Sequence, residues 1–184
     1  MNFLKKTYNY LKIRFYKNET IIVYDLKNHQ EQTSVATIKY ATNENLKDVI
    51  FCNISFGDAN SMITELNRLE TNTQNLIFSQ IVPSYTDSSI PAVNEYQTLM
   101  RKYYPNEELG FLSLEAFLSS KILVNAISRI KGEITREKFV YMLKTTPNNL
   151  LEGIDLEFKN SQLLNKTYLF EYKNDQFIEI KNEK

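Results

Sequence analysis

Few of the side chains that usually carry catalysis or bind metal ions are present, and they form no recognisable constellation. The chain has one cysteine, Cys52, and one histidine, His29. A zinc site needs several such ligands, so neither residue predicts a metal centre. Cys52 lies inside an apolar run, where a thiol usually behaves as a small buried side chain. His29 has no serine or cysteine nucleophile tied to it by a local signature. We therefore expect no metal, no cofactor and no catalytic residue.

Carboxylates, aromatic residues and glycines exclude further chemistries. Glu95 and Glu115 lie on separate predicted helices, and nothing pairs two carboxylates at the spacing of a glycosidase. The 12 Tyr and 11 Phe residues have no basic interleaving, so most should belong to the core. Four dispersed glycines cannot form a phosphate-binding loop. The sequence therefore favours a protein that is not an enzyme.

Charge and the N-terminus bear on partners and location. Lys and Arg together number 22, as do Asp and Glu, so the chain has no net charge and nucleic acid is not an expected partner. Basic residues interrupt every apolar run in the first 17 residues. This start does not resemble a signal peptide, and no window approaches the roughly 18 consecutive apolar residues of a membrane span. As it stands, the chain is expected in the cytoplasm.

Residues 1–47 are predicted to be a separate N-terminal segment with one helix and two short strands. Apolar residues recur near helical spacing over residues 1–17, which predicts a helix. Residues 20–26 and 33–40 are rich in β-branched side chains, which predicts strands.

Residues 48–184 are predicted to form one α/β domain with a layered, parallel-type sheet and flanking helices. The almost continuously apolar run 49–55 is typical of a strand covered on both faces. A helix capped by Asp58 follows, and then a strand, 76–82, that ends at Pro83. Ser89 and Pro91 open a second helix. A helix of about eighteen residues from Ser113 is apolar over more than half its circumference, so it should pack between two layers. One more helix follows Thr135, and strands at 153–158, 167–172 and 176–180 form a short C-terminal meander.

Several ordered motifs resemble one protein family. They are FCNISFGDANSMITEL, LIFSQIVPSYTDSSIPAVNEYQ, FLSLEAFLSSKILVNAI, LLEGIDLEF and TYLFEY. Together they resemble the C-terminal part of the type 1 periplasmic binding proteins of the Leu/Ile/Val-binding family, the substrate-binding components of branched-chain amino-acid ABC transporters. The resemblance covers about residues 49–180.

The resemblance implies one lobe plus the hinge of a two-lobed protein that closes around a small amino acid or amide. The hinge would include Gln80, Val82 and Pro83, and closure would be a population shift driven by a ligand that touches both lobes. Residues 1–47 do not match a first lobe. The family is periplasmic or extracellular, and its members work with the membrane subunits of an ABC transporter.

Carried over position by position, the ligand-facing edge of the lobe falls at Ser55, Phe56 and Asp58. The carboxyl end of a strand beside a helix N-terminus is also where open α/β sheets bind ligands. Ser55 could donate to a carboxylate, Phe56 could line an apolar pocket and Asp58 could accept from an ammonium group. The alternative is that Asp58 only caps its helix while Ser55 and Phe56 only pack. Tyr85, just after the hinge proline, is a further candidate.

A second function stays open at this point. A half-protein could use the lobe surface that a partner lobe would normally cover, either to form a homodimer or to bind another protein, without any ligand.

Overall fold

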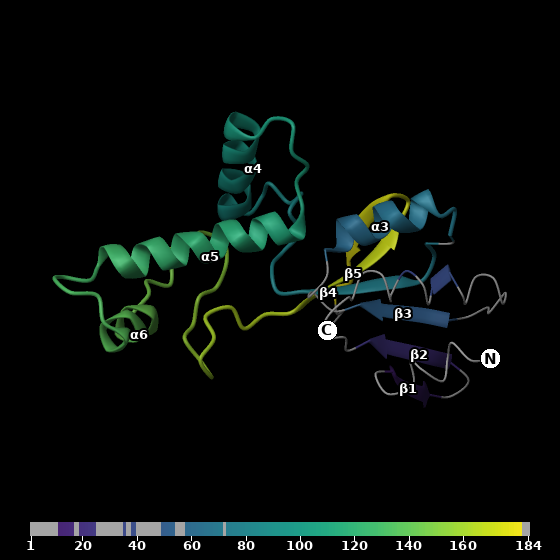
Figure 1. The fold of residues 1–184 in the computed structure, drawn as a ribbon, viewed down its shortest axis with the longest axis horizontal. Coiled ribbons are helices and arrows are strands. Elements are labelled where there is room, and N and C mark those ends of the chain that lie inside the picture. Colours follow the sequence, from purple (N-terminus) through teal and green to yellow (C-terminus); the bar gives the residue numbers. More distant parts are fainter. Residues whose placement is uncertain are drawn as a thin grey trace. The chain divides into compact units, whose positions relative to one another are not determined.

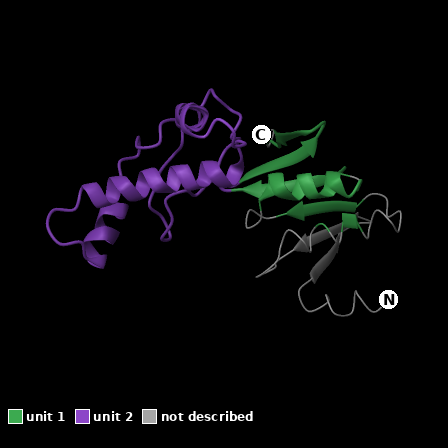
Figure 2. Ribbon diagram, turned by 45° about the horizontal axis from the view of Figure 1, so that its top comes forward, with its two compact units in different colours: residues 1–80, 168–184 green, residues 81–167 purple. Residues whose placement is uncertain are grey.

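The computed structural model describes residues 11–16, 19–24, 35, 38, 39, 49–53, 58–71 and 73–181. The chain divides into two compact units, shown in Figure 2: Met1–Gln80 together with Tyr168–Lys184, and Ile81–Thr167. It therefore passes between the units twice, after Gln80 and after Thr167.

The first unit is built on one mixed sheet. Among the described residues it has six strands in the order β1-β2-β3-β4-β5-β6 (Figure 1). Strands β2, β3 and β4 are parallel, whereas β1, β5 and β6 pair antiparallel with their neighbours. This confirms the α/β class, and the two C-terminal strands extend the same sheet. The strands are β1 (Leu11–Tyr16), β2 (Glu19–Tyr24), β3 (Val49–Asn53), β4 (Leu76–Gln80), β5 (Tyr168–Lys173) and β6 (Gln176–Glu179).

A single helix, α3 (Ala59–Arg68), links β3 to β4 and contributes to the core of the first unit. It buries Met62, Ile63 and Leu66, which follow helical spacing. The sheet buries alternate residues of β3, β4 and β5, and Phe78 meets Phe177 edge to face with ring centroids 5.3 Å apart. Each fully buried side chain of this size contributes about 1.5–3 kcal/mol, so this core holds helix and strands in register.

The predicted helix over residues 1–17 is wrong where the structure describes it. Leu11–Tyr16 is strand β1, paired with β2 in a register that leaves two residues between Tyr16 and Glu19. The segment LKIRFY alternates apolar and basic residues before its terminal Tyr, a period-2 pattern that outweighs the looser helical spacing. Residues 1–10 lie outside the described part.

Two other predicted strands are not strands. Val35, Ile38 and Lys39, within the predicted strand 33–40, are helical, with Val35 and Ile38 buried and Lys39 exposed as on one helix face. Residues 153–158 are irregular, although Ile154 and Leu156 are buried. In both segments the order of apolar residues reflects burial, not strand pairing. The strand predicted at 20–26 is confirmed by β2, and those at 167–172 and 176–180 by β5 and β6.

The second unit contains three helices among the described residues: α4 (Pro91–Tyr103), α5 (Phe111–Ser128) and α6 (Arg136–Lys144). Ser89 does not cap α4: the cap is Ile90, without a side-chain bond, and the Ser89 hydroxyl donates to Asp87. Pro91 opens the helix as predicted.

Polar contacts attach both neighbouring helices to α5. The Tyr96 hydroxyl of α4 shares a hydrogen bond of 2.6 Å with Ser113. Arg129, which caps the other end of α5, donates to the Thr145 hydroxyl at 2.6 Å and to the Met142 carbonyl at 3.3 Å. These bonds fix α4 near the start of α5 and α6 near its end, as Figure 1 shows.

Helix α5 is covered on one side only, which differs from the predicted packing between two layers. It buries five residues, whereas Leu112, Leu123, Val124 and Ile127 are exposed. Among the described helices it alone is long and apolar enough to cross a membrane by length and composition.

A glycine allows the segment after α6 to lie close to the start of α4. Gly153 has φ +83°, and a Cβ atom there would lie 2.9 Å from Pro91 Cδ and 3.1 Å from Ile90 Cγ2. Gly132 has a similar φ of +76°, but a Cβ atom would meet nothing closer than Lys138 Nζ at 4.0 Å. A side chain at either position would strain the backbone because φ is positive, but only at position 153 would its Cβ atom also be crowded.

We expect Gly153→Ala to lower the free energy of unfolding by about 2–5 kcal/mol, because strain and overpacking both apply. Gly132→Ala, the matched control, should lower it by only about 1–2 kcal/mol, the cost of the left-handed backbone. Urea denaturation of both variants measures the difference. Equal losses would show that the contact with Pro91 carries no weight.

Candidate functional site

The buried face of the sheet in the first unit becomes polar at the carboxyl ends of its parallel strands, which we call the polar edge. Along β3, β4 and β5 the register aligns Asn53 with Phe78 and Gln80 with Tyr168, so these side chains share a face. Asn53, Gln80 and Tyr168 are 7%, 3% and 9% exposed. They lie at the carboxyl ends of the parallel strands β3 and β4, where open α/β sheets bind ligands.

Asn53 is the unusual member of this edge. Its side-chain oxygen and nitrogen are both buried and have no hydrogen-bond partner in the part of the chain that the structure describes. An unpaired buried amide costs about 1–3 kcal/mol, and such groups call for an explanation in function or strain. Asn53 is not among the site residues predicted from the sequence. The sequence signal that could have identified it is an amide side chain at the end of the apolar run VIFCN, shortly before a predicted helix.

Asp58 stands at the same edge, at the N-terminus of α3. Its carboxylate accepts from Asn60 N at 3.3 Å, from Ser61 N at 3.2 Å and from the Ser61 hydroxyl at 2.5 Å. The predicted cap is thereby confirmed, while contact with a ligand stays a prediction. Ser55 and Phe56 lie outside the described residues, so the structure does not place them.

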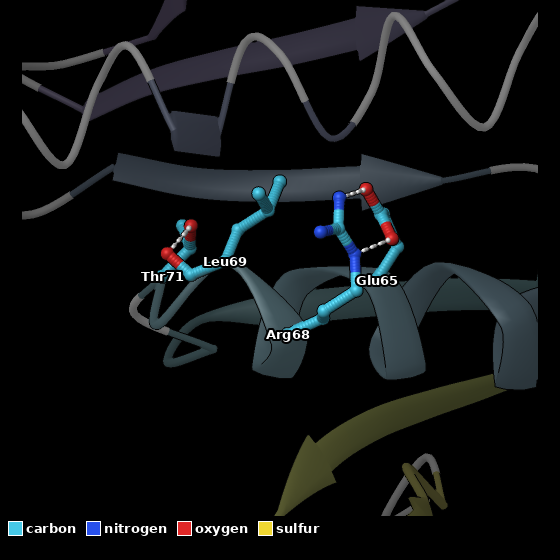
Figure 3. Close-up of polar contacts among 4 residues, drawn as sticks. All are labelled: Glu65, Arg68, Leu69 and Thr71. Carbon is cyan, nitrogen blue, oxygen red and sulfur yellow. Dashed lines mark hydrogen bonds and ion pairs between the residues drawn. The ribbon is translucent and has the colours of Figure 1, made fainter.

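The other end of α3 is closed by different contacts (Figure 3). Arg68 Nε and Nη2 donate to the Glu65 carboxylate at 2.7 and 2.6 Å, and this lowers the pKa of Glu65. Thr71 N donates to Leu66 O, around Glu70 with φ 51°. Because the ion pair of Arg68 with Glu65 is exposed, it contributes little to stability. The positive charge of Arg68 also interacts favourably with the negative C-terminal end of the helix dipole. The helix is thus capped at both ends.

Tyr85 and the predicted hinge residues lie around the passage between units. Tyr85 belongs to the second unit, where its ring meets Phe111 edge to face at 4.8 Å and its carbonyl accepts from Gln97 Nε2 at 2.9 Å. Asp58 and Tyr85 therefore lie in different units. The division falls directly after Gln80, and Val82 is buried at 1% exposure. The hinge role of Gln80, Val82 and Pro83 stays a prediction.

Two further titratable groups, one on β3 and one on α5, are affected by burial. Burial raises the pKa of the Cys52 thiol and that of the Glu115 carboxyl. Glu95 pairs with Lys121. In the described part of the chain, no group of three or more His, Cys, Asp or Glu side chains could hold a metal ion. A cavity of about 430 Å³ in the first unit lies at the opposite edge of the sheet, lined by residues 73–75 and 171–175, so it is separate from Asn53.

No family model and no curated protein matches the sequence. Solved structures do match it. A possible leucine/isoleucine/valine-binding protein from Rhodopirellula baltica shares 29% identity with a TM-score of 0.67, and the match covers 80% of this chain and 39% of that one. A leucine-binding protein from Thermotoga maritima matches with 16% identity, a TM-score of 0.64 and coverage of 82% and 41%. A branched-chain amino acid transporter substrate-binding protein from Streptococcus pneumoniae, in complex with isoleucine, matches with 14% identity, a TM-score of 0.59 and coverage of 82% and 42%.

The fold and these matches define the class: the chain has the mixed α/β fold of part of a type 1 periplasmic binding protein. More narrowly, it is similar to Leu/Ile/Val-binding and branched-chain amino-acid substrate-binding proteins of ABC transporters, which confirms the resemblance drawn from the sequence. The chain spans about 40% of the length of the proteins it matches.

Two substitutions at Asp58 separate its cap from its charge. Asp58→Ala removes the acceptor of Asn60 N and Ser61 N and should lower the free energy of unfolding by about 1 kcal/mol. Asp58→Asn keeps an equally good cap and should stay within a few tenths of a kcal/mol of the unchanged protein. Thermal denaturation at neutral pH measures both. If the two variants lost the same stability, charge and not capping would be the structural role of Asp58.

Proposed function

We propose that this chain supplies part of a binding site for a small amino acid or amide and acts in solute binding without catalysis. The observation that carries the proposal is Asn53, a buried amide at the carboxyl ends of two parallel strands that has no hydrogen-bond partner among the described residues. A ligand that both donates and accepts hydrogen bonds would satisfy both ends of this side chain.

The charges at the same edge fit an amino acid. Asp58 follows Asn53 by five residues and supplies a carboxylate, which can accept hydrogen bonds from an ammonium group. The N-terminus of α3 carries a partial positive charge, which favours a ligand carboxylate nearby. A zwitterion thus offers each of these groups a complement.

The similar proteins support the same class of ligand. Their descriptions name leucine, isoleucine and valine, or branched-chain amino acids, and one of them was solved with isoleucine bound. By this likeness the partners of the present chain would be a small amino acid and the membrane subunits of an ABC transporter. Because the chain spans about 40% of those proteins, it would contribute only some of the ligand contacts.

Thermal shift against leucine, isoleucine, valine, glutamine and acetamide tests the proposal. A ligand at ten times its Kd stabilises the native state by about 1.4 kcal/mol, which should raise the unfolding midpoint by about 3–6 °C. Asn53→Leu should abolish the rise and leave the midpoint of the free protein unchanged or higher, since it removes an unpaired buried amide. Asp58→Asn should weaken the response to amino acids but not that to neutral acetamide.

Asn67→Ala, an exposed asparagine on α3, is the matched control and should respond as the unchanged protein does. If none of the five compounds raised the unfolding midpoint, this result would count against solute binding by this chain. Combined with a dimer in light scattering, it would favour the second candidate function, a protein-interaction module, whose structural basis is the uncovered side of α5.

A further inference from the structure

The first unit has a cavity at the edge of the sheet opposite the polar edge. Its volume is about 430 Å³, and residues 73–75 and 171–175 line it. The first of these segments leads into β4, and the second contains the end of β5 and the turn to β6. We call it the hairpin cavity. Pockets of roughly 300–1000 Å³ bind small molecules in proteins, so the hairpin cavity is large enough to hold a ligand.

The backbone of both lining segments is held in place by the sheet. The Asn75 carbonyl accepts from Phe51 N at 2.9 Å, which ties the segment before β4 to β3. Asn174 and Asp175 form the two-residue turn between β5 and β6, with left-handed φ angles of 50° and 58°, as tight hairpin turns require. The Tyr172 hydroxyl donates to Asp175 Oδ1 at 3.2 Å. The walls of the cavity are therefore set by the fold.

Every side chain that lines the hairpin cavity forms hydrogen bonds. The lining holds three amides, two carboxylates, one ammonium group, the hydroxyl of Thr73 and the phenol of Tyr172. Amides and hydroxyls both donate and accept, carboxylates accept, and the ammonium group donates. No aliphatic side chain is among the lining residues. The cavity thus suits a ligand that is polar on all sides.

The charges of the lining favour a neutral ligand. Glu171 and Asp175 are acidic and Lys173 is basic, and neither of the ion pairs found among the described residues involves them. The two carboxylates oppose an anion such as phosphate, and the lysine opposes an organic cation. The cavity also lacks the ligands of a metal site, since no group of three His, Cys, Asp or Glu side chains lies together in the described part of the chain.

We propose that the hairpin cavity binds a neutral polyhydroxylated molecule, a monosaccharide or a cyclic polyol. Each hydroxyl group of such a ligand donates one hydrogen bond and accepts others, so one molecule can satisfy amides, carboxylates and the ammonium group together. A neutral molecule as small as acetamide would leave most of the volume of about 430 Å³ unfilled. This site lies at the opposite edge of the sheet from Asn53, and its ligand does not depend on the solute binding proposed there.

Two-dimensional amide NMR of the full chain tests the proposal. D-glucose, D-ribose and myo-inositol are titrated separately, with sodium phosphate as the anionic probe and putrescine as the cationic probe. We expect at least one of the three polyhydroxylated compounds to shift the backbone amide signals of residues 73–75 and 171–175 in a saturable way. Phosphate and putrescine should leave these signals in place.

Paired glycine substitutions show whether the cavity side chains carry the binding. Asn75→Gly combined with Asn174→Gly removes two amides from the lining, and glycine adopts the left-handed backbone of both positions without strain. The double variant should weaken the apparent Kd by about tenfold or more, because it lacks two hydrogen-bonding side chains. Asn160→Gly is the matched control: Asn160 is exposed, has φ 50° and lies in the second unit, so the Kd should not change.

Four results would overturn the proposal. They are the absence of a saturable shift with all three polyhydroxylated compounds, shifts of the same signals with phosphate or putrescine at equal or lower concentration, saturable shifts confined to residues outside the hairpin cavity, and an unchanged Kd in the double variant. Thermal denaturation of the double variant accompanies the titration. Its unfolding midpoint should stay close to that of Asn160→Gly, which separates lost binding from lost folding.

Discussion

The antiparallel pairing of β4 and β5 is the constraint on which both compact units depend. Gln80 ends the strand that leaves the first unit, Tyr168 begins the strand that returns to it, and the register sets these two residues opposite each other. The long segment between them starts and ends at neighbouring points of one sheet. Because the sheet already holds its ends together, that segment can form a core of its own without disturbing the first unit. The same pairing puts Gln80 and Tyr168 on the buried face beside the end of β3.

The sequence predicts well those elements in which local signals agree. The apolar run of β3, the cap at Asp58, the face of Met62, Ile63 and Leu66, and the proline after β4 all indicate one strand–helix–strand unit, and the structure has it. Prediction fails where one signal stands alone. Spacing near 3.6 suggested a helix over residues 1–17, although the alternation in LKIRFY fits the strand that residues 11–16 form, paired antiparallel with β2. Alternation in residues 153–158 suggested a strand, but none of the strands that the structure describes pairs with this segment.

The candidate site could be located from the sequence but not described. The rule that ligands bind beyond the carboxyl ends of parallel strands led to Asp58 and the residues before it. It did not lead to Asn53, because whether a terminal amide is exposed or buried depends on the neighbouring strand, and a sequence pattern does not give cross-strand register. The register Asn53 with Phe78 places the amide on the buried face, which turns an ordinary polar residue into an unpaired one.

Asn53 and the exposed apolar side of α5 depart in opposite ways from the rule that polar groups are paired and apolar surfaces are buried. At Asn53 a polar group is buried without a partner, and at α5 an apolar surface is exposed without a cover. Each destabilises the isolated chain, and natural sequences keep such departures mainly where another molecule or segment relieves them. The two features lie in different compact units and involve different residues. An unpaired buried amide is relieved by a hydrogen-bonding group, whereas an exposed apolar helix face is relieved by burial. Each of these two features thus has its own residues and its own way of being relieved.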